Sequence, residues 1–406
     1  MSQARNTITD ALRDPILASH LSHQEMEDFL IARLTPFQVP EADNWESEAE
    51  ELRRQVLKDV IFKGIPASWY EGKPEVVWTD TIETEHGYSI KKLRYEALPN
   101  LWVPALLYEP DVLSSPAPSV LNLNGHVGPP GKAIDYKQIR CINLAKRGII
   151  ALNPEWLYFG ELRTSGYTHN QAGHLDLAGA AGVGIFYLCM LRGLDVLADH
   201  EATDPERLAV TGLSGGGWQT IILSSLDKRV TLAAPNAGYV GLESRARFRG
   251  DIGDIEQNPA DLVATADYPV LTAMMAPRPT LLLYNDQDDC CFRTERAHPS
   301  VYLPVKPLFE AMGVPENLAF HSNTDPGTHN YDLDHRQQFY GFLNRHFLDS
   351  EGAVDTEFVS DGEVLSEESL TVGLPSGNAD FLSLATDFQA DLPRFRLPSG
   401  SKDQLD

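Results

Sequence analysis

The chain has 406 residues, of which 42% are hydrophobic, and its formal net charge at pH 7 is −25. Such an excess of carboxylates disfavours nucleic acid and anionic membrane surfaces as partners, because both need clustered cations. The length and the hydrophobic content are sufficient for one large core with extensions.

No run of about 18 apolar residues predicts a membrane span. Residues 1–9 also lack the apolar core that is typical of a signal peptide. The four cysteines, two of them adjacent at Cys290 and Cys291, do not form the pattern of a disulfide framework, so we expect free thiols in a reducing compartment. Together these features predict a cytoplasmic protein.

Residues 1–75 are expected to form a helical N-terminal extension. Within it, apolar residues recur at steps of three and four and define one face of a helix, formed by Trp45, Ala49, Leu52, Val56 and Val60. An apolar helix face of this kind is expected to be buried against another part of the protein. We expect it to cover the body of the protein near the mouth of a site or at a subunit interface, so a homo-oligomer is one possibility.

A catalytic domain is expected over residues 76–349, with antiparallel strands at its first edge between Val76 and Pro110. Parallel strands are predicted at residues 119–124 and 149–153, and a long apolar helix is predicted from His174 to Asp199. Further apolar runs predict strands at residues 230–235, 279–284 and 318–322. An amphipathic helix is expected from Arg336 to Leu348.

Two segments lie outside this strand and helix pattern. Residues 239–268 form a charged insertion, which we expect to be a lid, and residues 350–406 form an acidic tail that is expected to be partly ordered. Each charged residue of the insertion could select a polar substrate, but a solvated loop is the simpler interpretation. These residues are Arg245, Arg247, Arg249, Asp251, Asp254 and Glu256.

A nucleophile elbow is predicted around Ser214. Gly212 and Gly216 flank it in a G-x-S-x-G pattern, between an apolar run that ends at Leu213 and a predicted helix. Small residues at these places let strand and helix pass closely, and the turn exposes the serine hydroxyl. The amide of Gly215 would then donate to a developing oxyanion.

A second oxyanion donor is expected in the glycine-rich turn after residues 119–124, from the amide of His126 or Val127. His126 could instead contact the substrate or only shape the turn. Trp156, Tyr158 and Trp218 are candidate substrate-binding residues, although aromatic side chains lie more often in the core.

The base and the acid of a triad follow in the chain order Ser, Asp, His. His329 lies in a Gly-Thr-His turn after the last predicted strand, a combination that His298, His321, His335 and His346 lack. His169 and His174 are spaced by five, which does not suit a shared helix face. We interpret those six histidines as structural or solvent-facing. Asp286, Asp288 and Asp289 all follow the strand at 279–284, and charge alone does not separate them.

The chain resembles the α/β-hydrolase superfamily, in the branch of acetylxylan esterases, dienelactone hydrolases and prolyl-oligopeptidase-type catalytic domains. The resemblance covers roughly residues 76–348 and depends on the Asn124-Gly-His turn, on residues 204–217, on Ala276-Pro-Arg-Pro-Thr280 and on Gly327-Thr-His329. It differs from characterised acetylxylan esterases in having Gly215 after the serine, no Arg-Gly-Gln motif and Asn330 after the histidine.

The resemblance implies an α/β-hydrolase fold, with a mostly parallel central sheet and helices on both faces. It also implies that Asp288 is the triad acid, since the acid lies three positions after the residue that ends the strand, here Asn285; Asp289 is the alternative. The expected function is a serine hydrolase of short-chain carboxylic esters, such as acetylated sugars, with no metal or organic cofactor. A peptidase or amidase, a carbon-carbon bond hydrolase and a non-catalytic binding module are the alternatives.

Overall fold

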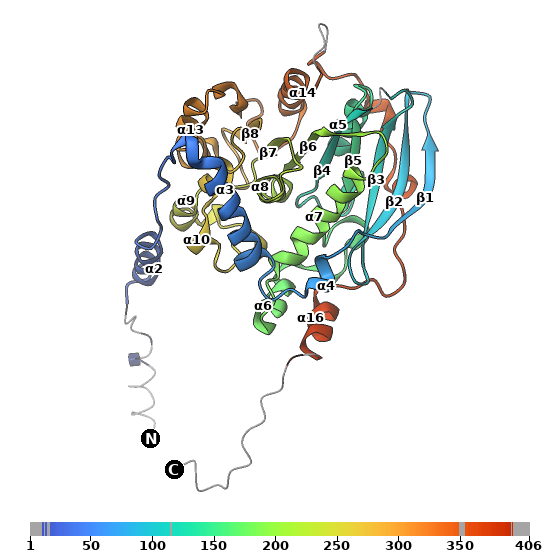
Figure 1. Ribbon diagram of the computed structural model, residues 1–406. Coiled ribbons are helices and arrows are strands. Elements are labelled where there is room, and N and C mark those ends of the chain that lie inside the picture. Colours follow the sequence, from blue (N-terminus) through green and yellow to red (C-terminus); the bar gives the residue numbers. More distant parts are fainter. Residues whose placement is uncertain are drawn as a thin grey trace, which may run out of the picture. The chain divides into compact units, whose positions relative to one another are not determined.

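The computed structural model describes residues 10–11, 13, 17–113, 116–348, 354–390 and 392 (Figure 1). Residues 1–9, on which the signal-peptide argument depends, lie outside this part of the chain. The described residues belong to two compact units. Unit 1 comprises residues up to 56, 206–253 and 260–357, and unit 2 comprises residues 57–205, 254–259 and those from 358 onward.

Unit 2 contains five neighbouring strands in the order β1-β2-β3-β5-β4. The first three are antiparallel, as the sequence predicts, and β5 pairs parallel to β4. Within this unit α7 packs on one face of the strands and α5 on the other (Figure 1). The strands are β1 (Val76–Glu83), β2 (Tyr88–Leu98), β3 (Leu101–Pro110), β4 (Ala117–Leu123) and β5 (Ile150–Pro154), and the longer helices are α5 (Asp135–Ala145) and α7 (Val183–Ala198).

Unit 1 contains four neighbouring parallel strands in the order β6-β7-β8-β9. Every residue of β7 and β8 is buried, as expected for strands covered on both faces. The strands are β6 (Thr203–Leu213), β7 (Leu232–Asn236), β8 (Thr280–Asn285) and β9 (Leu318–Asn323). The helices are α2 (Leu21–Ile31), α3 (Ala42–Val56), α8 (Gly215–Leu226), α9 (Leu242–Arg247), α10 (Leu262–Thr265), α11 (Tyr268–Ala273), α12 (Thr294–Ala297), α13 (Lys306–Ala311) and α14 (Leu333–Phe347).

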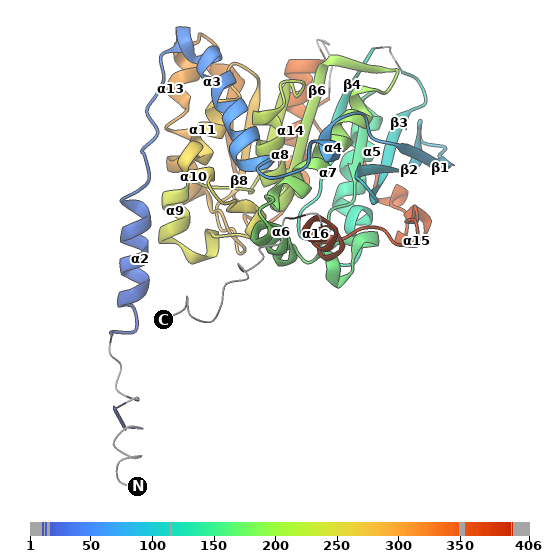
Figure 2. The same ribbon diagram turned by 60° about the horizontal axis from the view of Figure 1, so that its bottom comes forward.

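The apolar face predicted in the N-terminal region is present in α3, which packs beside α8 (Figure 2). Trp45 and Ala49 are buried, and the Trp45 indole donates a hydrogen bond of 3.0 Å to the backbone oxygen of Ala273. Arg53, also buried, donates through Nε to the backbone oxygen of Ser225. Helix α3 is therefore fixed within unit 1 by polar anchors as well as by apolar burial.

The single long helix predicted from His174 to Asp199 is wrong. The segment forms two helices, α6 (Gly173–Ala178) and α7, because Gly179 adopts a φ of 94° and ends α6. In the described residues no single helix is long and apolar enough to cross a membrane. Residues 169–178 and 183–198 meet that criterion only when they are taken together, and the pair is bent by 115°.

Much of the acidic C-terminal segment is ordered. Within residues 358–390, Leu370 of α15 (Glu367–Leu370) and Phe381 of α16 (Phe381–Ala390) are fully buried in unit 2. The Phe381 ring also packs on Phe186 with 5.2 Å between ring centroids. Apolar residues spaced far apart in this segment therefore anchor it, although it lacks a regular pattern.

Candidate active site

Ser214 lies in the sharp turn between β6 and α8, as the sequence predicts. Its φ of 60° and ψ of −121° place a non-glycine residue in a sparsely populated backbone region. Such strain persists only where surrounding contacts enforce it, and it is characteristic of functional sites. One of these contacts is a hydrogen bond of 2.8 Å from the Ser214 amide to the backbone oxygen of Asn236.

The close passage of strand and helix also depends on a glycine that the G-x-S-x-G pattern does not include. A Cβ on Gly217 would lie 2.4 Å from the backbone oxygen of Asn236, which is too close for any side chain. The same carbonyl accepts the Ser214 amide, so the contact that strains the serine also requires glycine at position 217.

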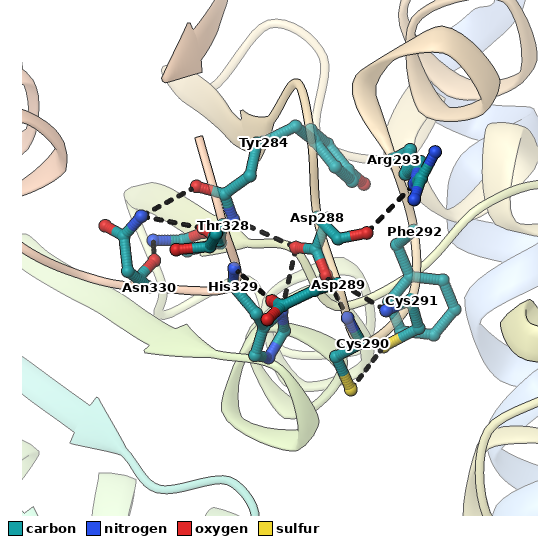
Figure 3. Close-up of polar contacts among 12 residues, drawn as sticks. Tyr284, Asp288, Asp289, Cys290, Cys291, Phe292, Arg293, Thr328, His329 and Asn330 are labelled. Atoms are coloured by element: carbon teal, nitrogen blue, oxygen red, sulfur yellow. Dashed lines mark hydrogen bonds and ion pairs between the residues drawn. The ribbon is translucent and has the colours of Figure 1, made fainter. Parts of the chain in front are cut away.

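His329 and Asp288 come together in the loops after β9 and β8. The Asp288 Oδ2 atom lies 2.8 Å from His329 Nδ1, and Figure 3 shows this carboxylate directed at the imidazole. The other oxygen of Asp288 accepts the amides of Cys290 and Cys291, at 3.0 Å each. Asp289, the alternative acid, accepts the backbone amide of His329 at 2.9 Å and makes no hydrogen bond to the imidazole among the described residues.

This pairing shifts both protonation equilibria. Burial lowers the pKa of His329, but the hydrogen bond and the charge of Asp288 raise it more, so the pKa lies above its usual value. Burial raises the pKa of Asp288, but the His329 contact and the Cys291 amide hold it below its usual value. A carboxylate bonded to Nδ1 fixes the tautomer in which Nε2 accepts a proton, as general-base chemistry requires.

The histidine loop is held by a network of asparagines. Asn330 donates through its side chain to Thr328 O at 2.7 Å and to Asn285 Oδ1 at 3.2 Å. The Asn323 side chain accepts the amide of Gly327 at 2.8 Å, where a φ of 71° favours glycine. The sequence did not predict this role for the asparagines, because no motif marks them and the contact of Asn330 with Asn285 spans 45 positions.

The remaining candidate residues are distributed over both units. Gly215, buried at the N-terminus of α8 in unit 1, is in the position expected of an oxyanion donor. His126 and Val127 belong to unit 2, so their role as the second donor stays a prediction. The His126 ring contacts Asp254 and packs against Trp156.

Two of the three candidate substrate-binding aromatics lie in the core. Trp218 is fully buried and donates through Nε1 to the Tyr268 hydroxyl at 3.1 Å. Trp156 is only 2% exposed and packs among Phe159, His169 and Phe186. We therefore leave both tryptophans out of the proposed binding surface. Tyr158, at 39% exposed, stays a candidate.

The charged insertion is less solvated than expected. Asp251 is fully buried, where it accepts Arg296 Nε at 2.6 Å and the Phe292 amide at 2.8 Å. Arg245 is buried too, with its guanidinium 4.5 Å from the Tyr268 ring centroid. These two charges stabilise the insertion itself. Arg247 and Arg249 remain exposed, as a solvated loop predicts.

Within the described residues, three groups of side chains have the spacing of metal ligands. One combines His126, His169, Asp254 and Glu256; the others are Cys290, Cys291 with His329, and His321, Asp334 with His335. All four cysteines are free thiols, as predicted. His335 is not free to bind a metal, since its Nε2 contacts Tyr284 O and its Nδ1 contacts the Asn236 side chain.

No protein-family model and no curated protein matches the sequence. Solved structures do match. Methylesterase BT1017 is 21% identical with a TM-score of 0.64, covering 91% of this chain and 79% of its own. A candidate acetyl xylan esterase from Bacteroides fragilis is 18% identical with a TM-score of 0.61, and the match covers 77% of this chain and 83% of the esterase. A glucuronoyl esterase from Solibacter usitatus is 14% identical, with a TM-score of 0.56 and coverage of 78% and 99%.

At these identities the similarity defines the fold. The protein has the α/β-hydrolase fold that the sequence resemblance implies, with a parallel-strand core, an elbow serine and a helical N-terminal extension.

Proposed function

We propose that the protein is a serine hydrolase of carboxylic esters, with Ser214 as nucleophile, His329 as general base and Asp288 as the acid that orients it. The observation that carries the proposal is the 2.8 Å contact between Asp288 and His329 Nδ1 in the unit that also holds the strained elbow serine. A non-catalytic binding module would have no need of either feature.

The proposed reaction begins when His329 Nε2 takes the Ser214 proton as Oγ attacks the ester carbonyl. The Gly215 amide, with that of His126 or Val127, stabilises the oxyanion. The tetrahedral intermediate then expels the alcohol, which receives the proton from His329. Water, activated by the same imidazole, hydrolyses the acyl-enzyme and restores Ser214. This cycle balances without a cofactor.

The proposed substrates are esters with a short acyl group and a polar alcohol such as a sugar. The names of the similar structures support this choice, since they describe a methylesterase, an acetyl xylan esterase and a glucuronoyl esterase. The insertion does not add to this support, because it exposes Phe248, Ile252 and Val263 as well as Arg247 and Arg249. Amide and carbon-carbon bond hydrolysis remain the alternative activities on this fold.

A substrate panel tests the proposal. We expect kcat/KM to be highest for acetyl esters, lower for butyryl and octanoyl esters of the same alcohol, and lowest for the matched amide. Ser214→Ala is the blank for each substrate. Efficiency that rises with chain length, or amide cleavage faster than ester cleavage, would refute the proposed substrate class. Turnover that is unchanged in Ser214→Ala would refute the mechanism.

A further inference from the structure

A second cluster of reactive side chains lies in unit 2, and the proposed ester hydrolysis does not use it. It comprises His126, His169, Asp254 and Glu256, each offering a ligand atom within 4.8 Å of the others. The Nδ1 atom of His169 lies 3.2 Å from Glu256 Oε1 and 3.5 Å from Asp254 Oδ2. The same Asp254 oxygen contacts His126 Nε2.

The charge of Glu256 is balanced in this cluster either by a proton on His169 Nδ1 or by a bound cation. Its side chain is fully buried, and no group among the described residues donates a hydrogen bond to either of its oxygens. A carboxylate without a donor or a cation is costly to bury. His169 Nδ1, which faces Glu256, is likewise buried without a hydrogen-bond partner in the described part of the chain.

The hydrogen bond of His169 Nε2 determines which nitrogen of the ring faces the two carboxylates. Its Nε2 lies 3.1 Å from the backbone oxygen of Leu157, which can only accept, so Nε2 carries the hydrogen. Burial lowers the pKa of His169, but its contacts with Asp254 and Glu256 raise it to about 9, so a proton on Nδ1 can balance the carboxylates. In the neutral imidazole, Nδ1 instead points a lone pair at both of them. Such an arrangement is stable when a cation lies between them, and a backbone carbonyl on the far nitrogen is the usual support of a metal-binding histidine.

We propose that His126, His169, Asp254 and Glu256 bind a divalent transition-metal ion of the zinc class. Bonds of about 2.0 to 2.2 Å to nitrogen and oxygen in a tetrahedron place neighbouring ligand atoms roughly 3.3 to 3.6 Å apart. The His169 contacts at 3.2 and 3.5 Å match this spacing, whereas the contact between His126 Nε2 and Asp254 Oδ2 is shorter and must lengthen when an ion binds. Two carboxylates and two neutral imidazoles carry two negative charges, which one divalent ion neutralises.

The ligand set also restricts the kind of ion. Imidazole with carboxylate suits zinc, manganese, iron and cobalt, whereas calcium and magnesium prefer ligands that are all oxygen. Asp254 and Glu256 come from the charged insertion, His126 comes from the turn after β4, and His169 begins a short 3-10 helix (His169–Ala172). The metal would therefore clamp residues 254–259 in place. This inference holds whether or not Ser214 is the nucleophile.

Zinc binding to the full chain tests the proposal. The protein is first stripped of metal with EDTA and dialysed. Calorimetry then follows its titration with zinc chloride. In a separate sample, cobalt is added and its visible absorption is recorded. We expect one zinc ion per chain and a zinc-dependent rise in Tm, because the ion binds the folded state. His126→Ala and Glu256→Gln should each weaken zinc binding by at least about tenfold, since each removes a ligand.

Three matched variants locate the ion. His174→Ala removes an exposed histidine near His169 in sequence, while Cys290→Ser and His321→Ala each disrupt one of the other two candidate groups. All three should bind zinc as the wild type does. His126 is half-exposed, so His126→Ala is expected to fold even if Glu256→Gln does not, and circular dichroism checks both.

Two results would overturn the proposal. The first is a wild-type chain that takes up neither zinc nor cobalt, in which case a proton on His169 balances the carboxylates. The second is zinc binding that survives in His126→Ala and in folded Glu256→Gln but is lost in Cys290→Ser or His321→Ala, which would place the ion elsewhere.

Discussion

The backbone oxygen of Asn236 accepts the amide of Ser214 at 2.8 Å, while the side chain of Asn236 donates to the backbone oxygen of Asn330 at 3.1 Å. One residue at the end of β7 thus connects the elbow serine to the residue that follows His329. Thr211 and Tyr331 form a parallel link between the same two segments, with 2.7 Å between their hydroxyls. The nucleophile and its base are therefore positioned relative to each other within unit 1.

Loss of the Asn236 side chain should misplace the base. In Asn236→Ala we expect kcat to fall by about 10²-fold with little change in KM, since a displacement of about 1 Å at the reacting atoms has that cost. Thr280→Ala is the control, because Thr280 is also buried but begins β8, remote along the strands from the site. Equal losses in the two variants would indicate general destabilisation and contradict a positioning role.

The two neighbouring aspartates should differ sharply. Asp288 contacts the imidazole, whereas Asp289 contacts the backbone amide of His329. Asp288→Asn should lower kcat by roughly 10⁴-fold, as known for a triad aspartate in serine proteases, and Asp289→Asn by less than about tenfold. Steady-state kinetics on an acetyl ester measures both. A larger loss of kcat in Asp289→Asn than in Asp288→Asn would show that Asp289 is the triad acid.

The pH profile should report the raised pKa of His329. The imidazole must be neutral to act as a base, so activity falls as the pH drops through its pKa, which lies above the ordinary 6.5 because of Asp288. We expect the acidic limb of kcat/KM above pH 6.5 in the wild type and at lower pH in Asp288→Asn. A limb that does not move would exclude Asp288 as the cause.

His335 should make folding stability depend on pH. Burial lowers its pKa from 6.5 to about 4, so between these values the unfolded chain binds a proton that the folded chain does not. The contribution of His335 to the free energy of unfolding, about 3 kcal/mol, is therefore fully present above pH 6.5 and is lost as the pH falls towards 4.

Urea unfolding at several pH values measures this loss. His335→Gln should flatten the decline in unfolding free energy over that range, relative to the wild type. His86→Gln, which replaces an exposed histidine, is the control and should leave the dependence of unfolding free energy on pH unchanged. A slope that is the same in all three proteins would show that His335 does not titrate as the structure indicates.

Local patterns predicted the strands, the elbow and the residues that bracket the site. Ser214 was found because a strand, small residues and a helix are adjacent in sequence, and Asp288 was preferred because the resemblance places the acid three residues after Asn285. These features depend on short-range chemistry, which a single sequence displays directly.

The rest depends on contacts between distant segments. Asn236 meets Asn330 across 94 positions, and Asp254 meets His126 across an even longer separation, so no spacing rule reveals them. The sequence predicts a structural or solvent-facing role for His169, because its spacing of five from His174 does not suit a shared helix face. Burial removed Trp156 and Trp218 as substrate-binding candidates, since an aromatic residue in the sequence suits either a pocket or a core.

Covalent labelling by a fluorophosphonate tests the central claim most directly. The probe bonds only to a serine whose hydroxyl is activated, and peptide mass mapping locates the adduct. We expect one adduct per chain on Ser214, slower labelling in Asp288→Asn and none in Ser214→Ala. A wild-type chain that is not labelled, or labelling that persists in Ser214→Ala, would contradict the assignment of this protein as a serine hydrolase acting through Ser214.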